Sequence, residues 1–119
     1  MAFSDNKPRT VSAPREFQVK VTLAADCEAG DLLTYNSGWK QAVANTATMV
    51  VVALTDGLSN EEISVSPFAI VSSITGMTAG GILRTAAAGA YDEATGTRVG
   101  YSLSATEAVV LPLLTTATA

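Results

Sequence analysis

The side chains best suited to chemistry in this chain are carboxylates, which occur as two adjacent pairs, Glu61-Glu62 and Asp92-Glu93. Two carboxylates can act as a general acid and a general base when both are held at a working separation beside one substrate. Neighbours in a strand or a turn tend to point apart instead. These four side chains are therefore expected to be solvated turn charges.

A third acidic segment could bind a cation. Asp56, Asn60 and Glu61 offer the oxygen ligands that calcium prefers, but they lack the alternating positions of a known calcium loop. The same segment starts with Asp-Gly and carries several charges, which is typical of a turn. The spacing therefore predicts a turn and no metal site.

Nucleophilic catalysis lacks its usual participants. The chain has no histidine, which removes the commonest general base, the commonest metal ligand and every Ser-His or Cys-His triad. The single cysteine, Cys27, lies between Asp26 and Glu28, whose charges disfavour the thiolate. No phosphate-binding or dinucleotide-binding glycine motif occurs. We therefore predict no catalytic residue, no cofactor and no metal, and a binding or structural protein that is not an enzyme.

Length and composition describe one small domain. A chain of 119 residues suffices for a single core, and its one cysteine cannot form an internal disulfide. Only 15% of the residues are charged, whereas an average soluble domain has about 25%. Two interpretations remain open: a partner covers part of the surface, or the many small residues simply dilute the charges.

The charges are unevenly placed along the chain. Residues 1–20 carry four basic and two acidic side chains, a net +2, and the remainder carries three basic and nine acidic, a net −6, which together give −4. An acidic body argues against nucleic-acid binding, which requires a clustered basic face. The basic leader is either an arm that docks on an acidic protein surface or a solvated, disordered segment.

The N-terminal stretch differs in composition from the rest of the chain. Residues 1–15 contain Pro8 and Pro14 among polar and charged residues, which predicts a flexible arm. No signal peptide is recognisable, and the longest strongly apolar run, Met49–Leu54, is far shorter than the about 20 residues of a membrane helix. We expect synthesis in a cytoplasm and no membrane partner.

From residue 16 onward, short apolar runs between turn residues predict β-strands. The clearest is Phe17–Leu23, where apolar and polar residues alternate with a period of two. Met49–Thr55 is a continuous run typical of a strand buried on both faces. The pattern predicts an all-β fold with at most one short helix. The expected chain has an extended N-terminal arm, a compact β-sandwich or barrel-like domain over residues 16–114, and a frayed tail over residues 115–119.

Two stretches about fifty residues apart share a glycine turn, an aliphatic pair and an aromatic residue. Ala29–Trp39 reads A-G-D-L-L-T-Y-N-S-G-W, and Ala79–Tyr91 reads A-G-G-I-L-R-T-A-A-A-G-A-Y. Either one β unit is used twice, or two Gly- and Ala-rich stretches are alike by chance. The pattern frames a β unit, and it predicts four residues in the core or at a subunit interface: Leu32, Leu33, Trp39 and Tyr91.

Several phrases of the sequence, taken in order, are similar to a known family. They are E-A-G-D-L-L, G-W-K-Q-A-V-A, V-V-V-A-L-T-D, E-I-S-V, A-G-G-I-L and R-V-G-Y-S-L, within a span from Phe17 to Leu114. Together with the polar leader, this order resembles the capsid decoration, or head cement, proteins of tailed bacteriophages. The motifs are soft patterns of glycine and aliphatic residues.

The resemblance implies a structural virion protein, usually a homotrimer. Such a protein sits on the outer surface of the expanded head and braces neighbouring subunits of the major capsid protein. Members of the family commonly reach the capsid lattice with an N-terminal arm, which here implies five candidate contacts: Phe3, Lys7, Arg9, Val11 and Arg15. The basic arm and the Thr/Ala-rich tail depart from the family pattern, so either end could engage differently.

The alternative hypothesis is a ligand- or carbohydrate-binding β module of a phage fibre or tail. Sites of this kind usually present several aromatic side chains on one surface. The aromatic residues available for it are Tyr35, Trp39, Tyr91 and Tyr101. Their positions in the fold therefore bear on the choice between the two hypotheses.

Overall fold

The structure is a computed structural model that describes residues 10–35, 37–43, 50–72, 74, 77–86, 89–93 and 98–111. The predicted all-β class is confirmed: the described residues form two antiparallel sheets and turns, with helical structure limited to short 3-10 turns such as η1 (Arg15–Phe17). Across these ranges, no helix has the length and apolar character needed to cross a membrane.

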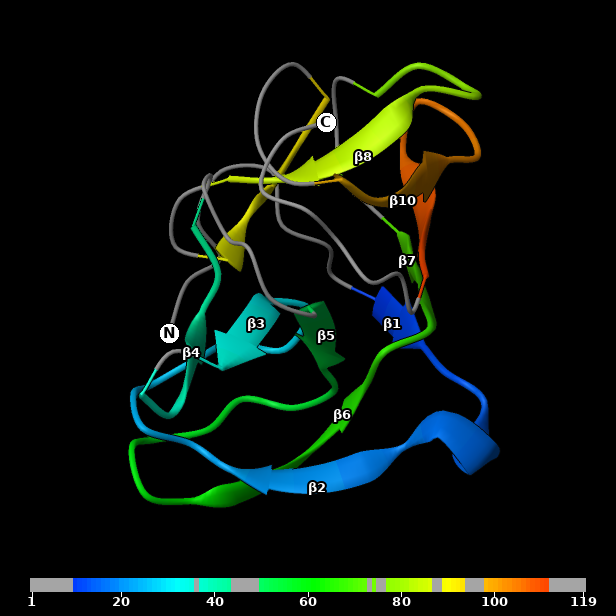
Figure 1. Ribbon diagram of the computed structural model, residues 1–119. Helices are drawn as coiled ribbons and strands as arrows, with labels where there is room; N and C mark the ends of the chain where they lie inside the picture. The colour runs from blue at the N-terminus through cyan, green and yellow to red at the C-terminus, as the bar shows by residue number, and fades with distance from the viewer. Residues whose placement is uncertain are drawn as a thin grey trace.

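Eleven strands of the described residues make up the two sheets. Figure 1 shows how most of these strands are arranged. The six-stranded sheet has the order β1 (Thr10–Ser12), β7 (Ala69–Ser72), β11 (Glu107–Val110), β10 (Arg98–Ser102), β8 (Ile82–Thr85) and β9 (Tyr91–Asp92). The five-stranded sheet has the order β2 (Val19–Thr22), β6 (Glu62–Ser66), β5 (Val50–Ala53), β3 (Leu32–Tyr35) and β4 (Trp39–Gln41).

The order of the strands reveals an internal duplication. The first half of the chain is arranged as β2-β6-β5-β3-β4 and the second as β7-β11-β10-β8-β9, which is the same order when the strands are numbered within each half. The turns match as well: the Gly30 amide donates to the Ala53 carbonyl and the Gly80 amide to the Ser102 carbonyl, both at 2.8 Å. The repeated sequence phrase therefore marks one five-strand unit used twice, with β1 added to the second copy.

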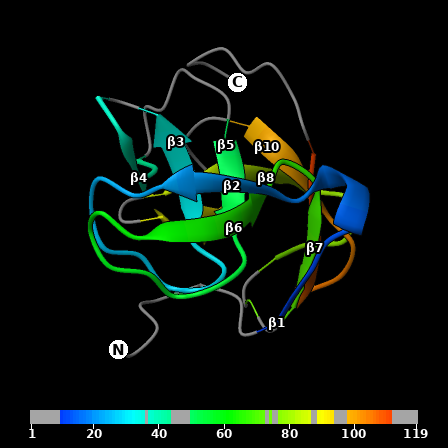
Figure 2. The ribbon, with the colours of Figure 1, turned by 90° about the horizontal axis from the view of Figure 1, so that it is seen from below.

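The first unit closes into a small barrel. The segment after β2 reaches β4 at the opposite end of the sheet, where Leu23 and Trp39 form a parallel bridge and the Ala24 amide donates to the Trp39 carbonyl at 2.9 Å. Seen from below, β2 and β6 lie in front of β3 and β5 (Figure 2). The barrel encloses a small core of Leu23, Cys27, Leu33, Val51, Ala53, Ile63 and Val65, with Val21 and Trp39 packed against it.

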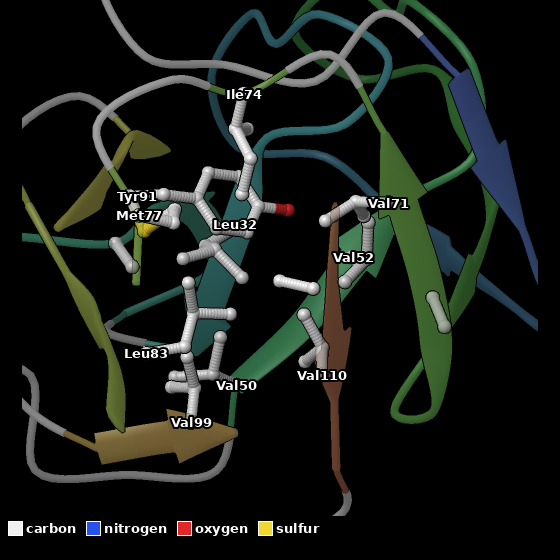
Figure 3. Packing of buried hydrophobic residues seen from close by; sticks show 13 residues of the cluster. Leu32, Val50, Val52, Val71, Ile74, Met77, Leu83, Tyr91, Val99 and Val110 are labelled. Carbon is white, nitrogen blue, oxygen red and sulfur yellow. The ribbon is translucent and has the colours of Figure 1, made fainter. Parts of the chain in front are cut away.

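The larger core lies between the two units (Figure 3). Adjacent side chains of a strand point to opposite faces, so Leu32 joins this core and Leu33 joins the small one. All of β5 is buried, as the continuous apolar run predicts. Each fully buried aliphatic side chain contributes about 1.5–3 kcal/mol. The larger core consists of Leu32, Ala42, Val50, Val52, Ala69, Val71, Ile74, Met77, Leu83, Tyr91, Val99, Ala108 and Val110.

Part of the segment predicted as a flexible arm is a strand. Thr10–Ser12 forms β1, which pairs with β7, and Val11 packs against the larger core. The folded body therefore includes Thr10, which is earlier than the predicted boundary at residue 16. Pairing with a strand sixty residues away decides this, and local composition carries no sign of it. Residues 1–9 and the predicted tail, 115–119, lie outside the described residues.

Candidate docking surfaces

Several carboxylates accept hydrogen bonds from backbone amides in two facing turns. Cys27 and Gly57 form an antiparallel bridge between these turns. Asp26 Oδ1 accepts from the Ser59 amide, and Asp56 Oδ1 accepts from the Ala29 amide, both at 2.8 Å. The arrangement repeats after thirty residues, because each aspartate caps the turn of the other segment. We call residues 26–31 and 56–61 the interlocked turns.

Each interlocked turn also contains its own carboxylate cap. Asp31 Oδ2 accepts from the Glu28 amide at 2.9 Å, and Glu61 Oε1 accepts from the Leu58 amide at 2.8 Å. The residue before each cap has a positive φ, 90° at Gly30 and 75° at Asn60, which glycine and asparagine tolerate best. These carboxylates hold the backbone together. In the described part of the chain, no group of three His, Cys, Asp or Glu residues is placed to hold a metal ion.

The second acidic pair has a similar structural use. Glu93 Oε2 accepts from the Thr78 amide at 2.8 Å and from the Ser102 hydroxyl at 3.0 Å. Asp92 Oδ1 accepts from the Glu93 amide at 2.9 Å. Cys27 is buried, and its thiol donates to the Thr55 carbonyl across 4.0 Å. The carboxylates and the thiol that could take part in catalysis therefore stabilise turns and the small core instead.

Three of the four predicted core residues are buried. Leu32, Leu33 and Tyr91 are almost fully buried, and Trp39 is half-buried at the rim of the small core. The Tyr91 hydroxyl donates to the Gly30 carbonyl at 2.7 Å and so links the second unit to the first. Burial raises the pKa of the Tyr91 phenol well above its usual range, and the nearby Asp31 charge raises it further.

The predicted arm contacts fall into two groups. Phe3, Lys7 and Arg9 lie outside the described residues. Val11 is half-buried in β1, with its side chain against the larger core, whereas Arg15 is exposed in η1. Of the two predicted contacts within the described residues, only Arg15 therefore has a side chain that is open to a partner.

An apolar row crosses the outer face of the six-stranded sheet. Ile70 on β7 pairs with Val109 on β11, Val109 pairs with Tyr101 on β10, and Tyr101 pairs with Ile82 on β8. Ile70 is 42% and Tyr101 52% exposed, and the other two are half-buried. On β7, β11 and β8, the side chains next to these residues are buried in the larger core. We call Ile70, Val109, Tyr101 and Ile82 the apolar row.

Charged residues border the apolar row on both sides. Glu107 lies two positions from Val109 on β11 and therefore on the same face of the sheet. Arg98 on β10 pairs with Arg84 on β8 beyond the other side of the row. An apolar centre with a charged rim is the usual composition of a protein interface. The row is a candidate docking surface on these grounds.

Sequence reasoning did not identify the apolar row. A signal was available, because A-I-V in β7 and A-V-V in β11 are continuous apolar runs. Such runs indicate burial on both faces, yet the structure covers only one face of these strands. Which face stays open depends on the neighbouring sheet, and a strand's own sequence does not contain that information.

The aromatic residues do not gather on one surface. Tyr91 is buried and Tyr101 belongs to the apolar row, so Tyr35 and Trp39 remain as a pair on the β3–β4 hairpin. Their rings lie edge to face, with centroids 5.6 Å apart and an interplanar angle of 76°. Tyr35 is 57% exposed.

No protein-family model and no curated protein sequence matches the chain.

Proposed function

We propose that this chain is a capsid decoration protein that binds the outer surface of a tailed-phage head and braces neighbouring major capsid protein subunits. The observation that carries the proposal is the apolar row, in which four apolar side chains from four adjacent strands lie together on the open face of one sheet. Exposed apolar patches with polar rims mark protein interaction sites. The family resemblance supplies the identity of the partner.

The shape of the row suits a protein surface. Strands in a sheet lie about 4.8 Å apart, so a row over four adjacent strands extends for about 14 Å. Small-molecule sites are concave and enclose most of their ligand, whereas this strip lies across the face of a sheet. The capping carboxylates of the interlocked turns and of Glu93 also accept hydrogen bonds from backbone amides, which supports a binding role over a catalytic one.

A trimer would make such modest surfaces sufficient. After one subunit docks, the second and third contacts become intramolecular, so the overall affinity greatly exceeds that of each patch. A ligand that binds only the assembled shell stabilises the shell by mass action. In this proposal the protein is a homotrimer on the outside of the virion and has no enzymatic step.

The test uses purified expanded shells and the full chain. Wild-type protein is expected to cosediment with shells and raise the temperature at which they come apart. Replacing the two most exposed members of the row in Ile70→Asp/Tyr101→Asp should lower the affinity at least tenfold. Val43→Asp is the matched control, because Val43 is 53% exposed outside the row. Wild-type protein that never binds shells would refute the proposed function. Equal binding of all variants would show that the apolar row is not the docking surface.

One observation favours the alternative function. The Tyr35–Trp39 pair is an accessible aromatic surface, and a carbohydrate-binding module would use it to stack against a sugar ring. On a glycan array, the alternative predicts specific binding that Tyr35→Ala and Trp39→Ala both reduce. Binding to shells with no signal on the array would exclude it.

A further inference from the structure

The two repeats differ at one edge. In the second unit, β1 is added alongside β7 with the antiparallel register Thr10↔Ser72, Val11↔Val71 and Ser12↔Ile70. In the first unit, β2 takes the place of β7 at the end of the sheet order. No strand among the described residues pairs with the outer edge of β2 along Val19–Thr22.

The register shows which residues of β2 and β7 correspond. Val19 and Val21 of β2 pair with Val65 and Ile63 of β6. Ala69 and Val71 of β7 pair in the same way with Val110 and Ala108 of β11. Val19 is therefore the counterpart of Ala69, and Val21 is the counterpart of Val71.

These counterparts differ sharply in exposure. Ala69 and Val71 are fully buried, whereas Val19 is 52% exposed and Val21 is half-buried. Beside β7, the added strand β1 also brings Val11 onto the core. Within the described ranges, the first unit thus lacks an added strand at this edge, and the second unit shows that an extended segment can pair with the equivalent edge.

We propose that the outer edge of β2 binds an extended segment of the major capsid protein, which is added as a sixth strand to the first sheet. This inference rests on the proposed function. The segment would carry an apolar residue between two polar ones, as Val11 stands between Thr10 and Ser12 in β1. Backbone hydrogen bonds supply affinity in strand addition, and alternate side chains supply specificity.

Lys20 distinguishes this partner from a second copy of the chain. It is exposed in the middle of β2. Edge lysines oppose pairing between identical edges, because antiparallel β2 strands would bring two like charges together. The incoming segment is therefore expected to place an acidic residue opposite Lys20. Such a segment pairs with the edge and neutralises the charge.

The first experiment measures shell binding of full-length variants. Val19→Asp and Lys20→Glu should each lower the affinity at least tenfold, while Val19→Thr retains a β-branched side chain and should bind within threefold of wild type. Val43→Asp is again the control for an added surface charge. Melting temperatures within a few degrees of wild type establish that the variants are folded.

A second experiment identifies the occupant. A photocrosslinking amino acid at position 20 should join the chain to a segment of the major capsid protein on assembled shells. Crosslinks between copies of the chain would overturn the inference, as would wild-type binding by the Val19 and Lys20 variants, and either result would leave the proposed function intact. Wild-type protein that does not bind shells would refute both proposals.

Discussion

The Glu93 carboxylate fills the space that a side chain at Gly81 would occupy. A Cβ built on Gly81 would meet Glu93 Oε2 and Cδ and, at 2.9 Å, the backbone carbonyl oxygen of Thr78. Gly81 follows the third turn of the same kind, in which Gly80 has a positive φ of 83° and the Gly81 amide donates to the Thr78 carbonyl at 2.8 Å. In the interlocked turns, the corresponding positions hold Asp31 and Glu61. The second unit thus obtains its carboxylate cap from a distant strand end.

This relationship predicts a rescue. Glu93→Ala should lower the free energy of unfolding by about 1–2 kcal/mol, because the Thr78 amide and the Ser102 hydroxyl lose their acceptor. Gly81→Asp in the wild-type background should also destabilise the fold, since two carboxylates would compete for one space. The double variant should recover part of the loss, giving a favourable coupling in a denaturation cycle. If the losses of the two single variants simply add up in the double variant, the carboxylate at position 81 does not replace the Glu93 cap.

The interlocked turns predict a second pair of effects. Asp26→Ala and Asp56→Ala should each cost about 1 kcal/mol, because each carboxylate caps an amide of the facing turn. Both bonds are exposed, which limits the cost. Asp26→Asn and Asp56→Asn keep an oxygen acceptor and should lose less. Urea denaturation measures the difference, and an Asn variant as unstable as its Ala counterpart would argue against the capping role.

Tyr91 predicts a pH dependence at high pH. Its folded-state pKa is raised by burial and then by Asp31, so the unfolded phenol ionises first, above pH about 10. The unfolded state then binds fewer protons than the native state, and stability falls as pH rises, by about 1.4 kcal/mol per pH unit from this group. Below pH about 10, the stabilising contribution of the neutral Tyr91 phenol is fully present.

The matched variant for this effect is Tyr91→Phe. It should cost about 1–2 kcal/mol at neutral pH, because the Gly30 carbonyl loses its donor. Above pH about 10 the difference in the free energy of unfolding between the variant and wild type should become smaller, since only wild type has an ionisable phenol at this position. Stability curves that stay parallel between pH 9 and 11 would show that folding does not raise the pKa of Tyr91.

Trp39 predicts a stability effect before any binding effect. Trp39→Ala should destabilise the chain by about 2 kcal/mol, less than the about 3–5 kcal/mol of a fully buried tryptophan, because the ring is half-buried at the barrel closure. Tyr35→Ala removes the more exposed ring of the pair and should cost less than about 1 kcal/mol. Unchanged stability of Trp39→Ala combined with lost glycan binding would reverse the preference between the two functions.

Local features of the sequence determined much of this fold. Alternation and short apolar runs predicted β-strands, and the absence of histidine excluded the common triads. The shared glycine phrases correspond to turns with equivalent hydrogen bonds at Gly30 and Gly80. These features are readable because strand period and turn conformation depend on nearest neighbours along the chain.

Tertiary structure alone decided which surfaces remain open. Trp39 and Tyr91 hold comparable places in the two phrases, yet Trp39 lies at a rim and Tyr91 is buried against the other unit. Val19 and Ala69 likewise occupy equivalent strand positions, and only Ala69 is fully covered. A period of two tells which side chains share a face. The cover of that face comes from strands distant in sequence, so the apolar row and the open edge of β2 are visible only after the chain has folded.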